Sequence, residues 1–513
     1  MKKLIIASLF ILTICACYDL DEDPRNVLNP EFFFETPDNV EMAVLGTYGL
    51  ITSEKLYGRK LTLSLQLRSD MCDIGNKGSE RRVQVNEFTL DAQNGMVAEI
   101  WPQAYKVIGA ANAAIYGAES LSSDHPEWIE TLDVLKAEAR FVRAFTYYHL
   151  VRLFGNIPYI DFYVSNPDLV KDMSQSTSQE VYDGIISDLK YARTYLPNKY
   201  PSNTRARATK GTAAAYLASV YLTLGSESGD QVSFEKAYNE AKYVIDSSSL
   251  FGYGLMDDFK DLFDGSNADG LKEHILVFDF LANVQGTGSQ NEDFIVPVNG
   301  IIGIERDGWS VSVPSIEVYD NWDALDYRKK ISFDDFVIDS NGDTIWYDSY
   351  EVVQRPHIAK YSRFGNGENI GARSDNNYVG MRYAEVLLIA AEAGNEVNGP
   401  VQETIDLLNK VRERARNWNG TLVDFPADIE LGITKEELRI LILEERRLEL
   451  AFEFKRWYDI KRRRLENYGD LRVFTDTITS LEPHVKFTDR DYLFPLPQDE
   501  LDRNPNLTQN PGY

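Results

Sequence analysis

Apolar side chains recur at helical spacing along two long stretches of the chain. From Trp101 onward, apolar residues occupy the i, i+3, i+4 and i+7 positions of one helix face, which is typical of an amphipathic helix. Gly155, Pro197 and Gly225 each stop a predicted helix. The same spacing predicts helices over residues 135–154, 179–196, 208–224, 234–245, 383–394 and 401–414. The protein is therefore expected to be mainly α-helical.

Two pairs of these helices resemble tetratricopeptide repeats, which are helical hairpins of ~34 residues. Residues 208–224 pair with 234–245, and small residues on one face of the second helix allow a close approach. Residues 383–394 and 401–414 form the second pair. We expect several such hairpins to stack into a scaffold. The alternative is a set of unrelated helical hairpins.

Residues 250–379 have no helix-length periodicity and are rich in turn-forming residues. Two short β runs flank Asn341-Gly342, the dipeptide most typical of a tight hairpin. Asp339, Asn341 and Asp343 alternate like the first ligands of a calcium loop. The glycine comes fourth rather than sixth, however, and no glutamate stands at the twelfth position. We therefore predict a loop-rich segment with small β-hairpins and no metal site.

The first residues have the layout of a secretory signal peptide. Two lysines precede an apolar run that is too short to span a bilayer, which needs ~20 apolar residues. Residues 1–16 end in Ala16 just before Cys17, an order that resembles a bacterial lipobox, in which the cysteine is lipidated. Residues 17–36 then form an acidic tether. A lipid anchor on Cys17 is the favoured interpretation, and an ordinary cleaved signal is the alternative.

Composition limits the class of protein. A net charge of −27 over 513 residues argues against binding nucleic acid or an anionic membrane surface. If Cys17 carries lipid, Cys72 is the only cysteine left in the mature chain, so neither an internal disulfide nor a cysteine zinc site is expected. The aromatic content of 12% suits a helical core or a sugar-stacking site, and the number alone does not distinguish them.

The chain lacks a Pro/Gly/Ser-rich linker, which favours interdigitated halves over separate domains. We place an N-terminal helical region at 37–249 and a C-terminal region at 250–513. The second region divides into a loop-rich part at 250–379, a helical part at 380–470 and an extended tail at 471–513.

Motifs of catalysis are missing from the sequence. Nucleophile elbows, phosphate-binding loops and dinucleotide fingerprints do not occur, and the five histidines are scattered. Among 80 aspartates and glutamates a carboxylate pair for glycoside hydrolysis can be imagined, but the sequence does not give the distance between them. We predict neither enzymatic activity nor a cofactor.

The C-terminal helical part carries charges that alternate in sign at spacings of three and four residues. Such spacing predicts ion pairs along a helix rather than a catalytic cluster. Trp457, within the same run, is expected to anchor the helix to the core. The charged residues are Arg446, Arg447, Glu449, Glu453, Arg456 and Asp459.

Several segments, taken in order, resemble the SusD/RagB family of outer-membrane nutrient-binding lipoproteins. The resemblance implies a lipid-anchored protein on the outer face of the outer membrane. Such a protein binds an oligosaccharide, or in some members a peptide, and acts as a non-catalytic lid on a SusC-like TonB-dependent transporter. A secreted glycan-degrading enzyme and a tetratricopeptide-type protein-binding scaffold are the alternatives from other classes. The resembling segments are residues 138–144, 153–158, 381–393, 408–415, 444–453, 456–462, 495–500, 504–507 and 509–513.

The resemblance also implies that a ligand binds on two irregular segments, residues 68–94 and 291–309. Trp309 follows a glycine in a predicted loop and is the first candidate for stacking on a sugar ring, with a loop anchor as the alternative. Trp322 is a weaker candidate. Polar side chains of the first segment are candidates for hydrogen bonds to sugar hydroxyls: Arg68, Asp70, Asn76, Arg81, Arg82 and Asn94.

Overall fold

The computed structural model describes most of the chain after the predicted signal peptide and tether. Cys17, residues 1–16 and most of the tether lie outside the described residues, as does the predicted ligand segment 291–309 except for its last two residues. Within the described part, no helix is both long and apolar enough to cross a bilayer. The described residues are 33–76, 78–202, 204–264, 269–281, 308–339, 341–361, 369–370, 373–464 and 488–513.

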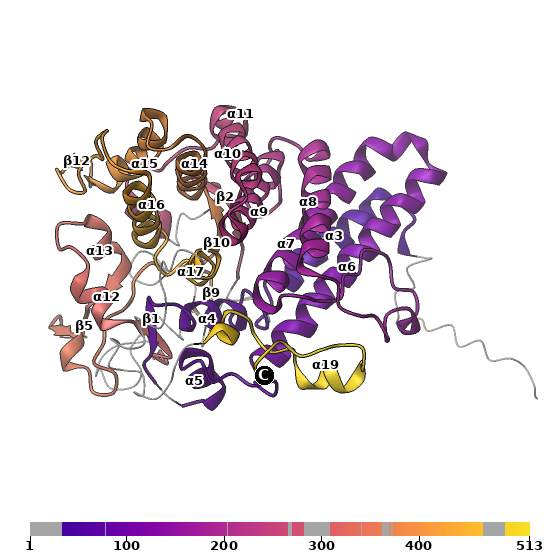
Figure 1. Cartoon of the computed structure of the whole chain (residues 1–513), viewed down its shortest axis with the longest axis horizontal. Coiled ribbons are helices and arrows are strands. Elements are labelled where there is room, and N and C mark those ends of the chain that lie inside the picture. The colour runs from indigo at the N-terminus through magenta and orange to yellow at the C-terminus, as the bar shows by residue number, and fades with distance from the viewer. Residues whose placement is uncertain are drawn as a thin grey trace, which may run out of the picture.

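Helices dominate the fold, as the apolar spacing predicts (Figure 1). The N-terminal half contains helices α3 (Pro37–Ile51), α4 (Lys60–Leu67), α5 (Glu80–Asn86), α6 (Val97–Asp124), α7 (Ile129–Phe154), α8 (Ser178–Tyr195), α9 (Lys210–Ser228), α10 (Gln231–Asp246) and α11 (Ser248–Phe251). The C-terminal half contains helices α12 (Ile316–Asn321), α13 (Tyr327–Ser332), α14 (Tyr383–Asn398), α15 (Gln402–Ala415), α16 (Lys435–Glu449), α17 (Arg456–Arg462) and α19 (Gln498–Arg503).

The long helices pack one after another into an array. Helix α6 packs on α7, α7 on α8, α8 on α9 and α9 on α10, and the array then continues from α10 directly to α14 and α15. Figure 1 shows this order from α3 and α6 at one side of the molecule to α14–α16 at the other. The loop-rich part between α11 and α14 is thus an insertion in a scaffold of tetratricopeptide-like helical hairpins, which confirms the predicted fold class.

Gly225, predicted to stop a helix, and Gly394, the last residue of another predicted helix, both lie inside the observed helices. Helix α9 runs through Gly225, where an added Cβ would come within 2.9 Å of the Phe234 ring. Helix α14 runs through Gly394, where a Cβ would meet the Tyr238 ring at 3.0 Å. These glycines let α10 approach both helices closely. The end of α9 comes at Gly229, whose φ of 74° forms a left-handed cap.

The C-terminal tail returns to the N-terminal half. The backbone N–H of Phe494 donates to the carbonyl of Leu153 at 2.7 Å, and the Asn510 side chain donates to the carbonyl of Phe154 at 2.9 Å. Figure 1 shows α19, in yellow, lying beside the lower ends of α6 and α7. The tail therefore satisfies carbonyl groups that the last turn of α7 leaves without a helical partner.

The strands in the described part of the chain form six short antiparallel pairs. These are β1 (Cys72–Ile74) with β3 (Ser312–Pro314), β2 (His274–Phe278) with β10 (Tyr378–Arg382), β4 (Phe333–Asp334) with β7 (His357–Ile358), β5 (Phe336–Ile338) with β6 (Thr344–Trp346), β8 (Asn369–Ile370) with β9 (Arg373–Ser374), and β11 (Asn417–Trp418) with β12 (Thr421–Leu422). The pair β5–β6 is the hairpin predicted around Asn341-Gly342. Asp339 Oδ1 accepts from the backbone N–H groups of Asn341 and Asp343 at 2.9 and 2.8 Å. This carboxylate shapes the turn.

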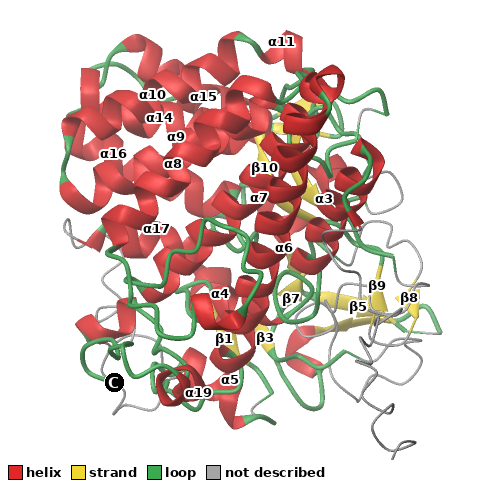
Figure 2. Ribbon diagram, turned by 90° about the vertical axis from the view of Figure 1, so that its right-hand side faces the viewer, coloured by secondary structure: helices red, strands yellow, loops and turns green. Residues whose placement is uncertain are grey.

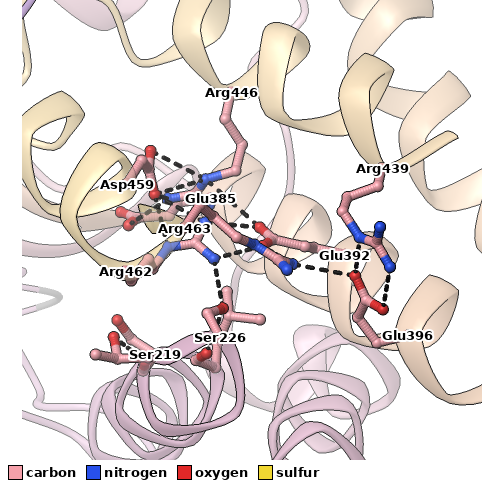
Figure 3. Close-up of polar contacts among 12 residues, drawn as sticks. Ser219, Ser226, Glu385, Glu392, Glu396, Arg439, Arg446, Asp459, Arg462 and Arg463 are labelled. Atoms are coloured by element: carbon pink, nitrogen blue, oxygen red, sulfur yellow. Dashed lines mark hydrogen bonds and ion pairs between the residues drawn. The ribbon is translucent and has the colours of Figure 1, made fainter. Parts of the chain in front are cut away.

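The alternating charges pair between elements rather than along one helix, which corrects the predicted i, i+3 and i+4 pairing for most of them. Arg446 on α16 lies 3.1 Å from Asp459 on α17, and Arg456 Nη2 lies 2.7 Å from the Asp70 carboxylate far away in the chain. Figure 3 shows Arg446, Asp459 and their neighbours in one buried cluster. Packing between segments that are distant in the chain determines which charged residues pair. Trp457, fully buried, is the predicted core anchor.

Candidate functional site

Strands β1 and β3 join the two segments in which a ligand site is predicted. They pair antiparallel with Ile74 opposite Ser312, and Figure 2 shows them side by side near α4 and α5. Beyond the strand ends, the backbone N–H of Asn76 donates to the carbonyl of Ser310 at 2.7 Å. Trp309 therefore lies directly beside the first predicted segment, although more than 230 residues separate the two in the sequence.

The backbone next to Trp309 is held tightly. Gly75 approaches so closely that an added Cβ would lie 2.5 Å from the Ser310 carbonyl oxygen. Ser310 itself has a φ of 48° in the left-handed region, and its hydroxyl lies 2.9 Å from Nε2 of the buried His357. A tight contact on one side and a hydrogen bond on the other fix this turn, so the position of Trp309 is defined by the core.

The Trp309 side chain is exposed to solvent at 44% and is flanked by two arginines. The guanidinium carbon of Arg59, just before α4, lies 5.1 Å from the indole centroid, and that of Arg82 on α5 lies 5.9 Å away. Both distances are within the range of a cation–π interaction. The arginine side chains are themselves largely buried, so they support the indole while part of its surface stays open.

Two more predicted polar residues lie on the elements that approach this indole. Arg81, next to Arg82 on α5, has a side chain that is 40% exposed and lies 3.9 Å from Glu99. The Glu99 carboxylate also contacts Lys60. Asn76 is partly buried beside the Ser310 turn. Trp309, Arg81 and Asn76 are thus the predicted site residues that are not buried.

Arg82 and four further predicted ligand-binding side chains are buried, and the structure corrects the expected role of these four. Arg68 donates to the carbonyls of Val85 and Asp491 at 3.2 and 2.7 Å. Asp70 accepts from Arg456 at 2.7 and 2.8 Å. These groups hold α4 against the C-terminal part.

Asn94 and Trp322 complete this group of four. The Asn94 carbonyl accepts from the backbone N–H of Met96 at 2.8 Å, just before α6 begins. Trp322 is 2% exposed and packs edge-on against Phe333, with ring centroids 5.2 Å apart. A ligand in solution does not reach either side chain.

A buried cavity of about 40 Å³ lies between the two halves of the molecule and is lined by Tyr57, His149 and Tyr458. Sites for small organic ligands have volumes of ~300–1,000 Å³, so this cavity admits water rather than a sugar. Arg446 also lines it, and its Nη1 has no hydrogen-bond partner within the described part of the chain. Ordered water is the partner that such a polar cavity fits.

Arg59 is the residue of the site that sequence analysis missed. Its position just before α4 lies outside the predicted ligand segments, and no local pattern connects residue 59 with residue 309. The described residues also contain no group of three or more histidine, cysteine, aspartate or glutamate side chains placed to hold a metal ion. The site therefore consists of one supported indole with polar and cationic neighbours, an arrangement suited to binding.

Family models define the class of protein. A model described as "SusD family" matches residues 338–513, and a model described as "Starch-binding associating with outer membrane" matches residues 20–222. A SusD-like protein of Formosa agariphila, designated P2, is 46% identical to this chain, and the alignment covers the whole of both chains. The chain belongs to the SusD family.

Solved structures share this fold. A SusD homologue from Bacteroides thetaiotaomicron has a TM-score of 0.83 and 22% identity, with 96% of this chain and 100% of that chain covered. A structure described as a laminarin-binding SusD-like protein has a TM-score of 0.75 and 24% identity, with 93% and 99% covered. A surface glycan-binding protein A from Bacteroides fluxus has a TM-score of 0.75 and 23% identity, with 93% and 100% covered.

Proposed function

We propose that this protein binds oligosaccharides at the cell surface and passes them to a SusC-like TonB-dependent transporter, without changing them chemically. The observation that carries the proposal is Trp309, a half-exposed indole on a rigid turn where two distant segments meet. Sugar rings have apolar C–H faces that stack on aromatic planes, while polar neighbours bond to the hydroxyls. The laminarin-binding relative and the family membership support a glycan as ligand.

Replacing Trp309 by alanine is expected to weaken oligosaccharide binding roughly tenfold or more, because the stacking surface is lost. Titration calorimetry of the full-length chain in detergent, against a panel of oligosaccharides and peptides, measures the effect. Trp418→Ala is the matched control, since Trp418 is 38% exposed and also has a cation, Lys330, over its ring at 3.5 Å. Equal affinity of Trp309→Ala and the unaltered chain would place the site elsewhere.

The same panel tests the other classes of function. Saturable binding of peptides alone would make this a peptide-binding member of the family. Release of shorter sugars during the titration would make it a glycan-degrading enzyme. Binding of neither, together with capture of a protein through the helical array, would make it a tetratricopeptide-type scaffold.

Anchoring through Cys17 is the second part of the proposal. The acidic tether after Cys17 and the family model's association with the outer membrane support a lipid anchor on the outer face of that membrane. Cys17→Ala is expected to abolish incorporation of labelled palmitate and to move the chain out of the membrane fraction. The transporter is expected to co-purify with the anchored chain. Unchanged palmitate labelling of the variant would contradict the assignment of Cys17.

A further inference from the structure

Arg152, on α7, is a buried cation that pairs with no carboxylate in the described part of the chain. The residue is 8% exposed. Its guanidinium carbon lies 3.5 Å from the ring centroid of Tyr148 and 3.5 Å from that of Tyr458. The aromatic rings stabilise the cation through their negative faces, but they carry no charge that balances it. Because a buried charge without a counter-charge is unfavourable, the surroundings of Arg152 need an explanation.

The hydrogen-bond donors of Arg152 are largely unused. The two tyrosine rings cover the faces of the guanidinium group, so its N–H donors point outward between them. Nε donates to the carbonyl of Tyr148 at 2.9 Å, and neither Nη group donates to any residue that the structure describes. The side chain lines the cavity of about 40 Å³ between the two halves of the molecule. Since a guanidinium group has five N–H donors, four of them remain beside this cavity.

The other three cations that line the cavity each have a carboxylate partner, in contrast to Arg152. Figure 3 shows Arg446, Asp459 and Arg462 close together in this part of the core. The three pairs are Lys455 with Glu385 at 3.2 Å, Arg446 with Asp459 at 3.1 Å and Arg462 with Glu392 at 2.7 Å.

Glu453 is the remaining carboxylate of the lining, and it does not balance Arg152 either. It pairs with Lys360 and Arg382, neither of which lines the cavity. One positive charge is therefore left over, that of Arg152. Water fits the cavity by size and accepts hydrogen bonds, but it does not balance a charge. A small anion does both.

We propose that this cavity binds a chloride ion against the guanidinium edge of Arg152. Arg446 Nη1, which lines the same cavity and has no hydrogen-bond partner among the described residues, is a further donor. A water molecule needs ~10–15 Å³ of such space, so about 40 Å³ has room for chloride, which is slightly larger than water. Hydrogen bonds from a charged donor to an anion are stronger than those to a neutral acceptor. The ion joins α7 to α16, and its binding is independent of glycan binding at Trp309.

The first test measures the stability of the full-length chain in detergent as the chloride concentration rises. Urea unfolding, followed by circular dichroism, is compared in sodium chloride and sodium gluconate at equal ionic strength, so that general screening is constant. An ion that binds only the folded chain raises the folding equilibrium constant about tenfold for each tenfold rise in concentration above its dissociation constant. We expect this slope with chloride and bromide and none with gluconate. Equal stability in chloride and gluconate would overturn the proposal.

Arg205 provides the matched control, because it is another buried arginine without a carboxylate partner in the described part of the chain. It is 5% exposed, and its guanidinium carbon lies 5.0 Å from the Tyr253 ring centroid. Its two Nη groups, however, donate to the carbonyls of Phe251 and Gly252 at 3.3 and 2.8 Å. Arg205 does not line the cavity.

Arg152→Met is therefore expected to abolish the dependence of stability on chloride, whereas Arg205→Met is expected to retain it. Arg152→Lys keeps the charge but has fewer donors in a different geometry, and it is expected to weaken chloride binding about tenfold. A chloride dependence that persists unchanged in Arg152→Met would place the ion elsewhere and overturn this site.

A crystal structure of the unaltered chain, prepared in bromide throughout, decides the question without any variant. Bromide replaces chloride and scatters anomalously, whereas water does not. We expect an anomalous peak in the cavity, within hydrogen-bond distance of the Arg152 Nη groups, that disappears when the protein is prepared in chloride. A cavity that contains water without an anomalous peak would overturn the proposal. Bromide at the surface alone would show an adventitious ion only and would overturn it as well.

Discussion

Replacing Arg382 by methionine is expected to lower the free energy of unfolding by about 3–5 kcal/mol, the usual cost of removing one partner of a buried ion pair. Arg382 is 1% exposed. Its Nε donates to Glu453 at 2.8 Å, and its Nη1 donates to Glu273 at 2.9 Å and to Glu449 at 2.5 Å. Methionine fills much of the space but leaves three buried carboxylates short of a cation.

These carboxylates depend on their cations to stay ionised. Burial by itself raises the pKa of Glu449, but Arg414, Arg382 and Arg328 outweigh burial and hold that pKa well below its usual range. Burial also raises the pKa of Glu453, but the charges of Arg382 and Lys360 outweigh burial and lower that pKa. Loss of Arg382 therefore destabilises the contacts among α16, β2 and β10, which join the helical array to the loop-rich insertion.

Denaturant unfolding followed by circular dichroism measures the change. Arg503→Met is the matched control, because Arg503 is 68% exposed and pairs with a single glutamate at 2.7 Å. Such surface pairs contribute ~0–1 kcal/mol. Arg382→Lys is expected to lower the free energy of unfolding by an amount between those of Arg382→Met and Arg503→Met, since lysine keeps the charge but loses the fork of donors. A loss below about 1 kcal/mol in Arg382→Met would contradict the importance of this network.

Mild acid is expected to destabilise the protein because two histidines are buried in their neutral form. Burial lowers the pKa of His357 to about 4, while its Nε2 bonds to the Ser310 hydroxyl. Burial, together with the charges of Arg152 and Lys455, holds the pKa of His149 well below its usual value. His149 lies between the hydroxyls of Tyr57 and Tyr458, at 3.0 and 2.8 Å.

The direction of the effect follows from proton binding. Between pH 6.5 and about 4 the unfolded chain protonates these histidines and the folded chain does not, so stability falls as the pH falls. Each histidine contributes up to ~1.4 kcal/mol per pH unit, and His357 alone accounts for about 3 kcal/mol across the window. Below about pH 4.5, protonation of the unfolded chain's carboxyl groups adds to the loss, because Glu449 and Glu453 have lowered pKa values when folded.

Urea unfolding at pH 7.0, 6.0 and 5.0 measures this slope. His357→Gln is expected to remove about half of the histidine contribution between pH 6 and 5, whereas His125→Gln, at an exposed side chain, is expected to leave the slope unchanged. Stability that is flat from pH 7 to pH 5 would contradict buried neutral histidines. Because His357 also supports the turn beside Trp309, its substitution is expected to weaken oligosaccharide binding as well.

Some features of the site could be predicted from the sequence, and others could not. A glycine-preceded tryptophan in a polar loop was a sound candidate for exposure, and Trp309 is open to solvent at 44%. Arg68, Asp70 and Trp322 looked equally suitable because polar or aromatic residues in irregular segments are often at the surface. In the folded protein these side chains are buried instead, because each contacts partners hundreds of residues away or within a local core.

The helical class, the Asn341-Gly342 hairpin and the family could be predicted from the sequence, because apolar spacing, turn preference and motif order are local properties of a chain. Three contacts could not be predicted from it: β1 pairs with β3, Arg59 reaches Trp309, and Glu449 binds Arg382 rather than a neighbour on its own helix. These contacts join segments far apart in the chain. They form because the helical array buries a common core, and that core sets which distant side chains meet.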